Sequence, residues 1–298
     1  MLLICCALLA GISCSDRRPT SSAVSPGQTK EVTDDAGRRV IIPTKVERFV
    51  SLAPNLTEIA YAIGAGQRLV GNTTFCNYPE QAKSVTKVGD TLQPSIERIL
   101  ALRPQLVLVS TASQLEAFTS QLNEHQIAVY ITDPHDLEGV FRTIVNLGDL
   151  LNEPGAASEL VKQLRARSET VERAVAKRPP VRVFFQLSGQ PLYTAGKTSF
   201  VTNLIERAGG RSVTSDVNEA WPRLSDEAAL ASRPEAVIIL SGETMGADTK
   251  VAPALQNSPA VRTGRVYSID GDLLTRPGPR LVDGLEQIAR ALHPDLFK

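Results

Sequence analysis

The sequence has few of the residues from which metal sites, disulfides and catalytic dyads are built. Three histidines and four cysteines occur among 298 residues, and the motifs HxxxH, HExxH, CxxC and GxSxG are absent. The net charge is zero, whereas nucleic-acid binders usually carry a basic surplus. The sequence therefore gives no support for an enzyme, for a metal site built from side chains, or for a nucleic-acid binder.

The N-terminus carries an apolar run at residues 1–13 (MLLICCALLAGIS). A bilayer span needs about 20 residues, so this run fits the apolar core of a secretory signal instead. Cys14 follows small residues and precedes a polar stretch, as in bacterial lipoprotein signals. We predict a lipoprotein-type signal at 1–14 with Cys14 as the lipidated residue; the alternatives are a plain cleaved signal or a buried strand.

Residues 15–30 (SDRRPTSSAVSPGQTK) are rich in serine, proline and charge, and predict a flexible tether that spans roughly 20 Å. Three of the four cysteines precede this tether. After removal or modification of the signal, Cys76 has no partner for an internal disulfide. We expect Cys76 to be an inert buried thiol, because no histidine lies near it in the sequence.

One segment of the sequence occurs twice. Residues 95–107 read SIERILALRPQLV and residues 225–237 read SDEAALASRPEAV, and seven residues recur in step. The repeat predicts two related lobes and places Glu97 and Glu227 at equivalent positions. Each stands two residues after a serine expected to cap a helix, where the helix dipole favours negative charge. We expect both carboxylates to be ionised and exposed.

Each half of the chain alternates predicted strands and helices, which is typical of a parallel α/β sheet. A hairpin is expected at 31–43, before the first such unit. The strands are expected near 48–52, 106–109 and 129–131 in the first half, and near 182–186, 236–240 and 266–269 in the second. Helices near 136–151 and 280–292 are expected to close the two halves.

The segment between the halves, 153–178, predicts one long helix. Its apolar residues recur at helical spacing, Pro154 suits a first turn, and Pro179 with Pro180 ends the pattern. A helix of about 24 residues is roughly 36 Å long and stiff. The predicted fold is α/β, with two lobes of mainly parallel sheet at 31–152 and 179–298 joined by this single helix, and the lobes should move only slightly against each other.

Six motifs together resemble the helical-backbone (class III) solute-binding proteins of ABC importers, and most of all their cobalamin-binding members. The resemblance covers about residues 30–296. The motifs are VSLAPNLTEIAYAIGAG (50–66), NYPEQAKSVTKVGD (77–90), SIERILALRPQLVLV (95–109), PLYTAGKTSFVTNLIERAGG (191–210), EAWPRLSDEAALASRPEAVII (219–239) and GDLLTRPGPRLVDGL (271–285).

The resemblance implies an extracytoplasmic receptor that captures cobalamin (vitamin B12) or a related corrinoid between its lobes. It would deliver this ligand to an ABC permease dimer with its ATPase subunits. The implied protein is no enzyme, has no cofactor of its own and is a monomer. It would be periplasmic or at the cell surface, and attached to the membrane only through lipid on Cys14.

The resemblance also assigns roles to individual residues. In that family one acidic residue per lobe docks into arginine-rich pockets of the permease, and by position these are Glu97 and Glu227. Rings and polar groups in loops at the strand ends would hold a flat macrocycle. One position departs from the pattern, since Thr91 stands where the best-known cobalamin binder has a tryptophan. The candidate ligand-binding residues are Phe75, Tyr78, Tyr193, Trp221, Asp272 and Arg276.

Two alternatives remain open. For each aromatic residue the alternative is ordinary packing. For the ligand the alternative is a ferric siderophore or haem carried by the same fold. An anionic siderophore would require basic residues in the cleft, for which Arg223 and Arg276 are candidates, and haem would require an axial ligand such as Tyr78 or Tyr193.

Overall fold

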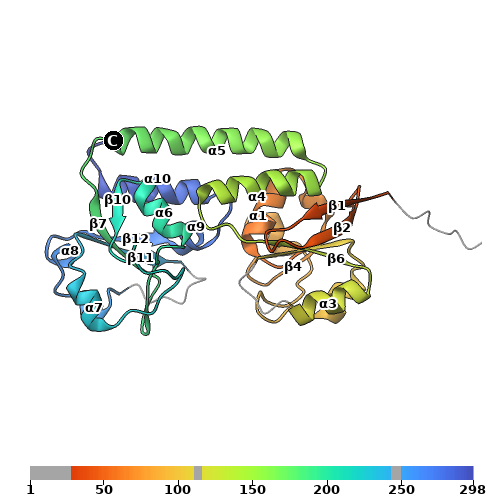
Figure 1. Ribbon diagram of the computed structural model, residues 1–298, viewed down its shortest axis with the longest axis horizontal. Helices are drawn as coiled ribbons and strands as arrows, with labels where there is room; N and C mark the ends of the chain where they lie inside the picture. Colours follow the sequence, from red (N-terminus) through yellow and green to blue (C-terminus); the bar gives the residue numbers. More distant parts are fainter. Residues whose placement is uncertain (1–27, 111–115, 243–249, 298) are drawn as a thin grey trace, which may run out of the picture.

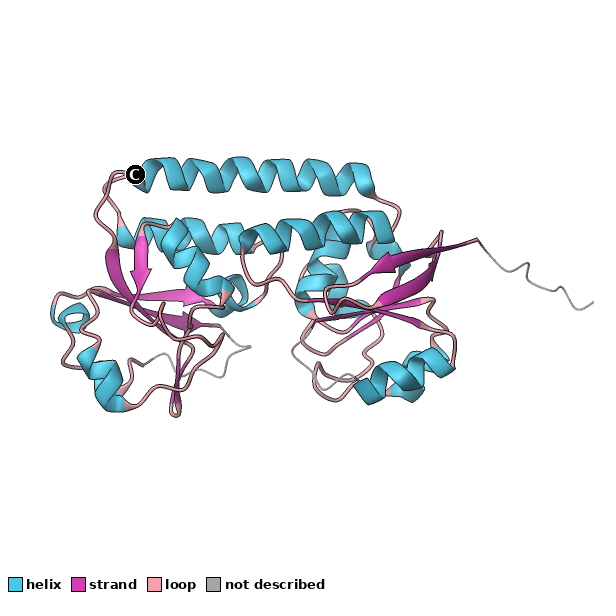
Figure 2. Cartoon of the chain, in the orientation of Figure 1, coloured by secondary structure: helices cyan, strands magenta, loops and turns pink. Residues whose placement is uncertain are grey.

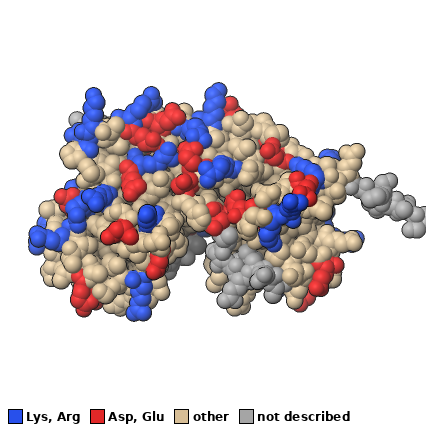
Figure 3. Space-filling view, in the orientation of Figure 1, with Lys and Arg blue, Asp and Glu red and all other residues tan. Residues whose placement is uncertain are grey.

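The computed structural model describes residues 28–110, 116–242 and 250–297. The predicted signal with Cys14, and the predicted tether as far as residue 27, lie outside these ranges. Among the described helices, none combines the length and the apolar character that a membrane span requires. Lysine and arginine side chains are interspersed with acidic ones over most of the face seen in Figure 3.

Two α/β lobes lie side by side beneath one long helix, as predicted (Figure 1). We call the part from β1 to α4 the N-lobe and the part from β7 to α10 the C-lobe. The N-lobe sheet has the strand order β4-β3-β5-β6 and the C-lobe sheet the order β10-β7-β11-β12, and both are parallel throughout. The strands are β3 (Phe49–Ser51), β4 (Leu69–Asn72), β5 (Leu106–Ser110) and β6 (Ala128–Thr132) in the N-lobe, and β7 (Val181–Gln186), β10 (Gly210–Ser212), β11 (Ala236–Ser241) and β12 (Val266–Asp270) in the C-lobe.

Two antiparallel hairpins add to these sheets. The predicted N-terminal hairpin consists of β1 (Thr29–Thr33) and β2 (Arg39–Pro43), so its first strand begins within the range expected for the tether. The second hairpin pairs β8 (Ser188–Gly189) with β9 (Leu192–Tyr193) in the C-lobe. It was not expected from the sequence, because two-residue strands leave no period to detect.

Helices cover both faces of the sheets. In Figure 2, α4, α5 and α10 lie along one side of the two sheets, and α3, α7 and α8 lie on the other. The helices are α1 (Pro54–Ala62), α2 (Ile96–Ala101), α3 (Glu116–Glu124), α4 (Leu137–Leu150), α5 (Pro154–Val175), α6 (Phe200–Arg207), α7 (Asp226–Ala231), α8 (Pro259–Arg262), α9 (Gly271–Thr275) and α10 (Leu281–Leu292), with 3₁₀ turns at Gly66–Arg68, Glu80–Ser84 and Pro253–Leu255.

The central strands are apolar on both faces because each face packs on a different core. In β5, Leu106 and Leu108 join the core beneath the long helix, whereas Val107 and Val109 join a second core in the N-lobe. Strand β11 of the C-lobe divides its side chains in the same way. Side chains alternate between the two faces of a strand, and continuous apolar runs are typical of strands buried on both faces.

The repeated sequence segment forms the same structure in each lobe. It makes α2 followed by β5 in the N-lobe and α7 followed by β11 in the C-lobe, each next to the outer strand β6 or β12. An arginine makes the same contact in each lobe. Arg48 donates to the carbonyl of Leu102 directly after α2 (2.6 Å), and Arg182 donates to the carbonyl of Ser232 directly after α7 (2.5 Å). The two lobes therefore share one topology and local contacts that fix α2 and α7.

The connecting helix α5 spans 22 residues and is slightly shorter than predicted. It ends at Val175, four residues before Pro179, which has no backbone N–H with which to continue a helix. Its ion pairs reach both lobes. Arg165 pairs with Glu138 of α4 (2.7 Å), and Arg167 pairs with Glu286 of α10 (2.9 Å).

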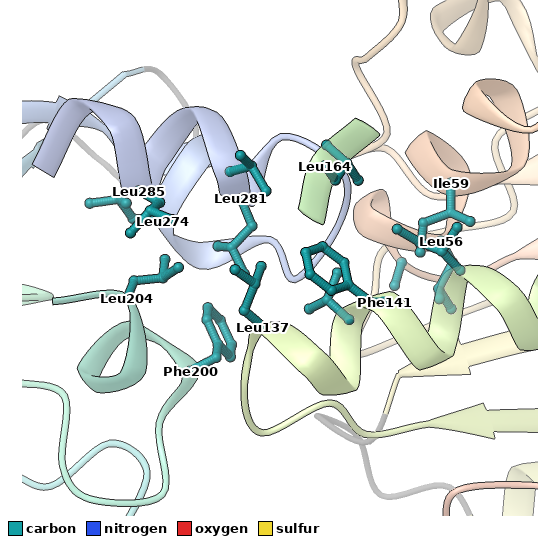
Figure 4. Close-up of a cluster of buried hydrophobic side chains, with 14 of the residues drawn as sticks. Leu56, Ile59, Leu137, Phe141, Leu164, Phe200, Leu204, Leu274, Leu281 and Leu285 are labelled. Atoms are coloured by element: carbon teal, nitrogen blue, oxygen red, sulfur yellow. The ribbon is translucent and has the colours of Figure 1, made fainter. Parts of the chain in front are cut away.

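One cluster of buried apolar side chains runs through both lobes below α5. Leu137 and Phe141 of α4 lie between side chains of α1 in the N-lobe and side chains of α6 and α10 in the C-lobe (Figure 4). A core that is continuous across the junction opposes large hinge motion, because interiors are densely packed and opening would expose apolar surface. The labelled members of the cluster are Leu56, Ile59, Leu137, Phe141, Leu164, Phe200, Leu204, Leu274, Leu281 and Leu285.

Candidate functional site

A cavity of about 300 Å³ lies between the two lobes. Both lobes contribute residues to it from the carboxyl ends of their parallel strands, where open α/β sheets place their ligands. Its lining is mostly uncharged and includes one aromatic ring, one acid and one base. The lining residues are Ala53, Pro54, Asn55, Phe75, Thr91, Ser110, Asp272, Thr275, Arg276 and Pro277.

Phe75 is the aromatic residue of the cavity and is 43% exposed. Its loop is held from behind by Lys87, whose ammonium group donates to Asn72 Oδ1 (2.8 Å) and to the carbonyls of Cys76 (3.2 Å) and Ala82 (3.0 Å). Burial lowers the pKa of Lys87, but the three acceptors satisfy its three protons. Cys76 is buried below the same loop, as predicted. A rigid loop thus presents an exposed ring to the cavity.

Arg276 and Asp272 come from the C-lobe and are in direct contact. Asp272 stands in the first turn of α9, and Arg276 follows the last residue of that helix, so the two face each other one turn apart. Arg276 Nη2 lies 2.7 Å from Asp272 Oδ1. Arg276 is 6% exposed and also donates through Nη1 to Asn77 Oδ1 of the N-lobe (2.7 Å).

A buried acid from the N-lobe lies behind Arg276. Glu58 of α1 is 3% exposed and accepts from Arg276 Nη1 (3.3 Å), Arg280 Nη2 (2.6 Å) and Arg280 Nε (2.9 Å). The guanidinium of Arg280 also lies over the ring of Tyr78, 4.1 Å from its centroid. Tyr78 is 47% exposed, so its ring closes this interlobe cluster on the solvent side. The cluster joins two helices that are more than 200 residues apart in the sequence.

The other two candidate aromatics do not line this cavity. Tyr193 lies in β9, paired with Ser188, and bridges to Arg223. Trp221 is half-buried and packs its ring against Phe185 and, edge-on, against Phe200, whose ring centroid is 5.7 Å away. Packing on the apolar core accounts for a tryptophan in a stretch that looked irregular in the sequence. Both residues belong to the C-lobe, outside the described lining of the cavity.

Glu97 and Glu227 lie at equivalent places in the two lobes. Each side chain is exposed in the first turn of a short helix, behind the N-cap serine, Ser95 or Ser225, as predicted. The residue's own backbone N–H, and then the serine hydroxyl, lower the pKa of each carboxyl group. Both groups are therefore ionised at neutral pH. Beside Glu227 a hollow of about 820 Å³ is bordered by the β8–β9 hairpin and Arg223.

Sequence reasoning missed Glu58, Asn77 and Arg280. A signal for Glu58 was present, since it is the one acid in the otherwise uncharged segment 49–66. A carboxylate inside an apolar helix needs a buried cation, because burying an unpaired charge is costly. Its partners could not be found, because periodicity does not report contacts between distant segments. In the part of the chain that the structure describes, no group of three His, Cys, Asp or Glu side chains could hold a metal ion.

The chain is similar to known proteins along most of its length. Residues 49–273 match the family model described as periplasmic binding protein. An uncharacterized ABC transporter substrate-binding lipoprotein of Bacillus subtilis, YvrC, is 32% identical, over 100% of this chain and 96% of the relative. The vitamin B12-binding protein BtuF of Vibrio cholerae has a TM-score of 0.75 at 28% identity, over 86% of this chain and 100% of that one. The haem-binding protein RhuT of Roseiflexus in its apo form has the same TM-score at 26% identity, over 84% and 99%.

Proposed function

Since the chain belongs to the periplasmic binding protein family, we propose that it captures cobalamin or a related corrinoid between its lobes and delivers it to an ABC importer. One part of this statement does not depend on the identity of the ligand: the protein is a substrate-binding protein of an ABC transporter and not an enzyme. The similarity to BtuF supports the choice of ligand. RhuT, equally similar in fold, binds haem, so the cavity itself must carry the argument.

The composition of the interlobe cavity carries the proposal. Its charged residues, Asp272 and Arg276, neutralise each other, and amide and hydroxyl groups make up the other polar side chains. A corrin ring has uncharged amide arms, which need donors and acceptors but no compensating charge. Phe75 offers apolar contact to the ring. A flat ligand would rest one face or edge on this floor, between the two lobes.

The ligand proposal is tested by calorimetric titration of the purified chain. Cyanocobalamin is expected to bind as one molecule per protein, and more tightly than haemin or a ferric siderophore. No heat with cyanocobalamin, together with saturable binding of a ferric chelate, would overturn the corrinoid assignment.

We expect Phe75→Ala to weaken corrinoid binding without affecting the fold. Loss of a central aromatic contact reduces affinity by about 2 kcal/mol, or roughly 30-fold, whereas exposed substitutions change stability by about 0.5 kcal/mol or less. Leu92→Ala is the matched control, because Leu92 is 74% exposed and is absent from the cavity lining. Titration and thermal unfolding of both variants check this. Equal affinities for the two variants would remove Phe75 from the site.

Haem is the second candidate ligand, and Tyr78 is the observation that favours it. Its exposed ring lies at the edge of the interlobe cluster, against the partly buried Arg280, and a tyrosine oxygen can ligate haem iron. The described cavity lining contains no tyrosine or histidine. A haem would therefore have to lie further out, towards Tyr78, which makes this the weaker proposal. Two further roles stay proposals: Tyr193 as an axial ligand of haem iron, and Trp221 as a contact of the bound ligand. Each would require a ligand that extends beyond the described cavity lining, which contains neither residue.

The remaining proposals concern location and partners. We propose that the protein is a monomer outside the cytoplasmic membrane, docks on a permease dimer through Glu97 and Glu227, and is anchored by lipid on Cys14. YvrC, which is named a lipoprotein, supports the anchor. Labelling with radioactive palmitate is expected to mark the wild-type chain and not Cys14→Ser. Label in both chains, or in neither, would contradict the anchor at Cys14.

A further inference from the structure

Four charged side chains form a closed group behind the interlobe cavity. Glu58 comes from the N-lobe, whereas Asp272, Arg276 and Arg280 come from the C-lobe. Arg276 contacts both acids, and Arg280 makes two hydrogen bonds to the carboxylate of Glu58. The group therefore contains two negative and two positive charges, and it is balanced only because Glu58 reaches across from the opposite lobe.

Arg280 remains charged in this environment. Burial alone disfavours the charged form of Arg280, but hydrogen bonds and Coulomb attraction from Glu58 outweigh it and raise the pKa of that guanidinium. Without Glu58 the C-lobe would contribute one excess positive charge directly behind the cavity lining. Interactions between charges are strong there, because the side chains are removed from water and little screened.

One donor in this group has no acceptor. Nη2 of Arg276 is fully buried and makes no hydrogen bond, because the direction of approach to Asp272 gives an ion pair without hydrogen-bond geometry. An unsatisfied buried donor costs about 1–3 kcal/mol. Arg276 is 6% exposed and lines the cavity, so a ligand oxygen there lies against its guanidinium, although Nη2 itself is closed to solvent. The cavity wall thus includes an arginine that belongs to a group of zero net charge.

We propose that Glu58 is a specificity-determining residue that keeps the cavity selective for uncharged ligand oxygens over carboxylates. This rests on the proposed function, in that the ligand bears amide arms. An amide carbonyl accepts from Arg276 without needing a counter-charge. A carboxylate in the same place adds a negative charge to an already balanced group, and burying a charge without compensation is unfavourable. Glu58 acts through the two arginines and needs no contact with the ligand.

The test compares two ligands that differ in one group. Cyanocobalamin is titrated against its monocarboxylates, each with one propionamide hydrolysed to the acid. The wild-type protein is expected to prefer the amide by about 10-fold for at least one arm, on the scale of one unit charge in a partly screened site. Glu58→Gln leaves one excess positive charge and is expected to abolish or reverse this preference.

The double variant Glu58→Gln with Arg280→Gln separates charge from structure. It removes one charge of each sign, so the group is neutral again and the preference for the amide should return, whatever the absolute affinity. If Glu58 only held the lobes together, the double variant would lose more contacts than the single variant and would show no such return. Thermal unfolding confirms that each variant is folded.

The outcomes distinguish the two proposals. Wild-type protein that binds none of these corrins contradicts the proposed function, and the role of Glu58 with it. Wild-type protein that binds corrins, with the same ratio of amide to acid affinity in all three proteins, overturns the role of Glu58 and leaves the corrinoid function standing. Loss of the preference in both variants would reduce Glu58 to a structural link between the lobes.

Discussion

The double variant Glu97→Ala with Glu227→Ala is expected to bind its ligand normally and to lose uptake. Both carboxylates are exposed on the ends of short helices, α2 and α7, that hold the same place in the two lobes. Neither lines the interlobe cavity. Truncating one partner of a buried charge pair at an interface costs about 2–5 kcal/mol, so losing both is expected to weaken docking by about 1,000-fold or more.

Transport of labelled cyanocobalamin and calorimetric titration of the same proteins check this prediction. The matched control is Glu159→Ala with Glu169→Ala, which removes two exposed acids from the helix α5, on the opposite side of the C-lobe from α7 (Figure 1). The control should transport normally at equal net charge. Loss of ligand affinity in the Glu97 and Glu227 variant, or normal uptake by it, would contradict the docking role.

The same pair predicts how docking depends on pH. The pKa of each carboxyl group is lowered from the usual 4.5 by its own backbone N–H and then by the capping serine. Because the pKa lies below 4.5, more than half of each carboxyl group still carries its charge at pH 4.5, and the charge is lost as the pH falls through the lowered pKa. Docking measured by surface binding should therefore be constant around neutral pH and weaken only in the acid range; a loss that begins near neutral pH would contradict the docking role.

Phe141→Ala is expected to destabilise the whole protein by about 3–5 kcal/mol, the range found for buried phenylalanines. Phe141 is fully buried in α4, at the centre of the cluster that continues from one lobe into the other (Figure 4). The guanidinium of Arg165 in α5 also lies over its ring, 5.0 Å from the centroid. The cavity left by this ring would therefore open at the junction of the lobes and the connecting helix.

Urea unfolding of Phe141→Ala and of Val145→Ala measures this effect. Val145 lies one turn further along α4 and is 40% exposed, so its truncation should change the free energy of unfolding by about 0.5 kcal/mol or less. Because the core is continuous, both proteins should unfold in one transition with a similar slope. A separate early transition for one lobe in the wild-type protein would contradict the continuous core.

Local patterns in the sequence were sufficient for the fold and for the acids on α2 and α7. Strand β5 is a continuous apolar run after a proline, and α5 has an apolar stripe between prolines, so each could be predicted without knowledge of its neighbours. The repeat then aligned Glu97 with Glu227. Each of these acids is exposed and lies near a capping serine because it stands in the first turn of its helix. This spacing within one turn can be read from the sequence.

The ligand site could be predicted only in part, because it depends on contacts between distant segments. Phe75, Asp272 and Arg276 do line one cavity, whereas Glu58 and Arg280 pair across 222 positions of sequence that carry no signal of the contact. Trp221 is rare in composition and stands in an irregular stretch, but its ring packs on Phe200, which only the folded chain brings near. Whether an aromatic ring packs in the core or contacts a ligand depends on how deeply the ring is buried. The burial of a single ring in a loop cannot be predicted from the sequence pattern.

The most direct test of the account is a crystal structure of the protein with cyanocobalamin. We expect one corrin between the lobes, with an amide oxygen next to the guanidinium of Arg276 and the ring of Phe75 against the macrocycle. The contact between Glu58 and Arg280 should remain as it is without ligand. A corrin bound elsewhere on the protein, or one placed between the lobes without contact to Phe75 and Arg276, would contradict the account.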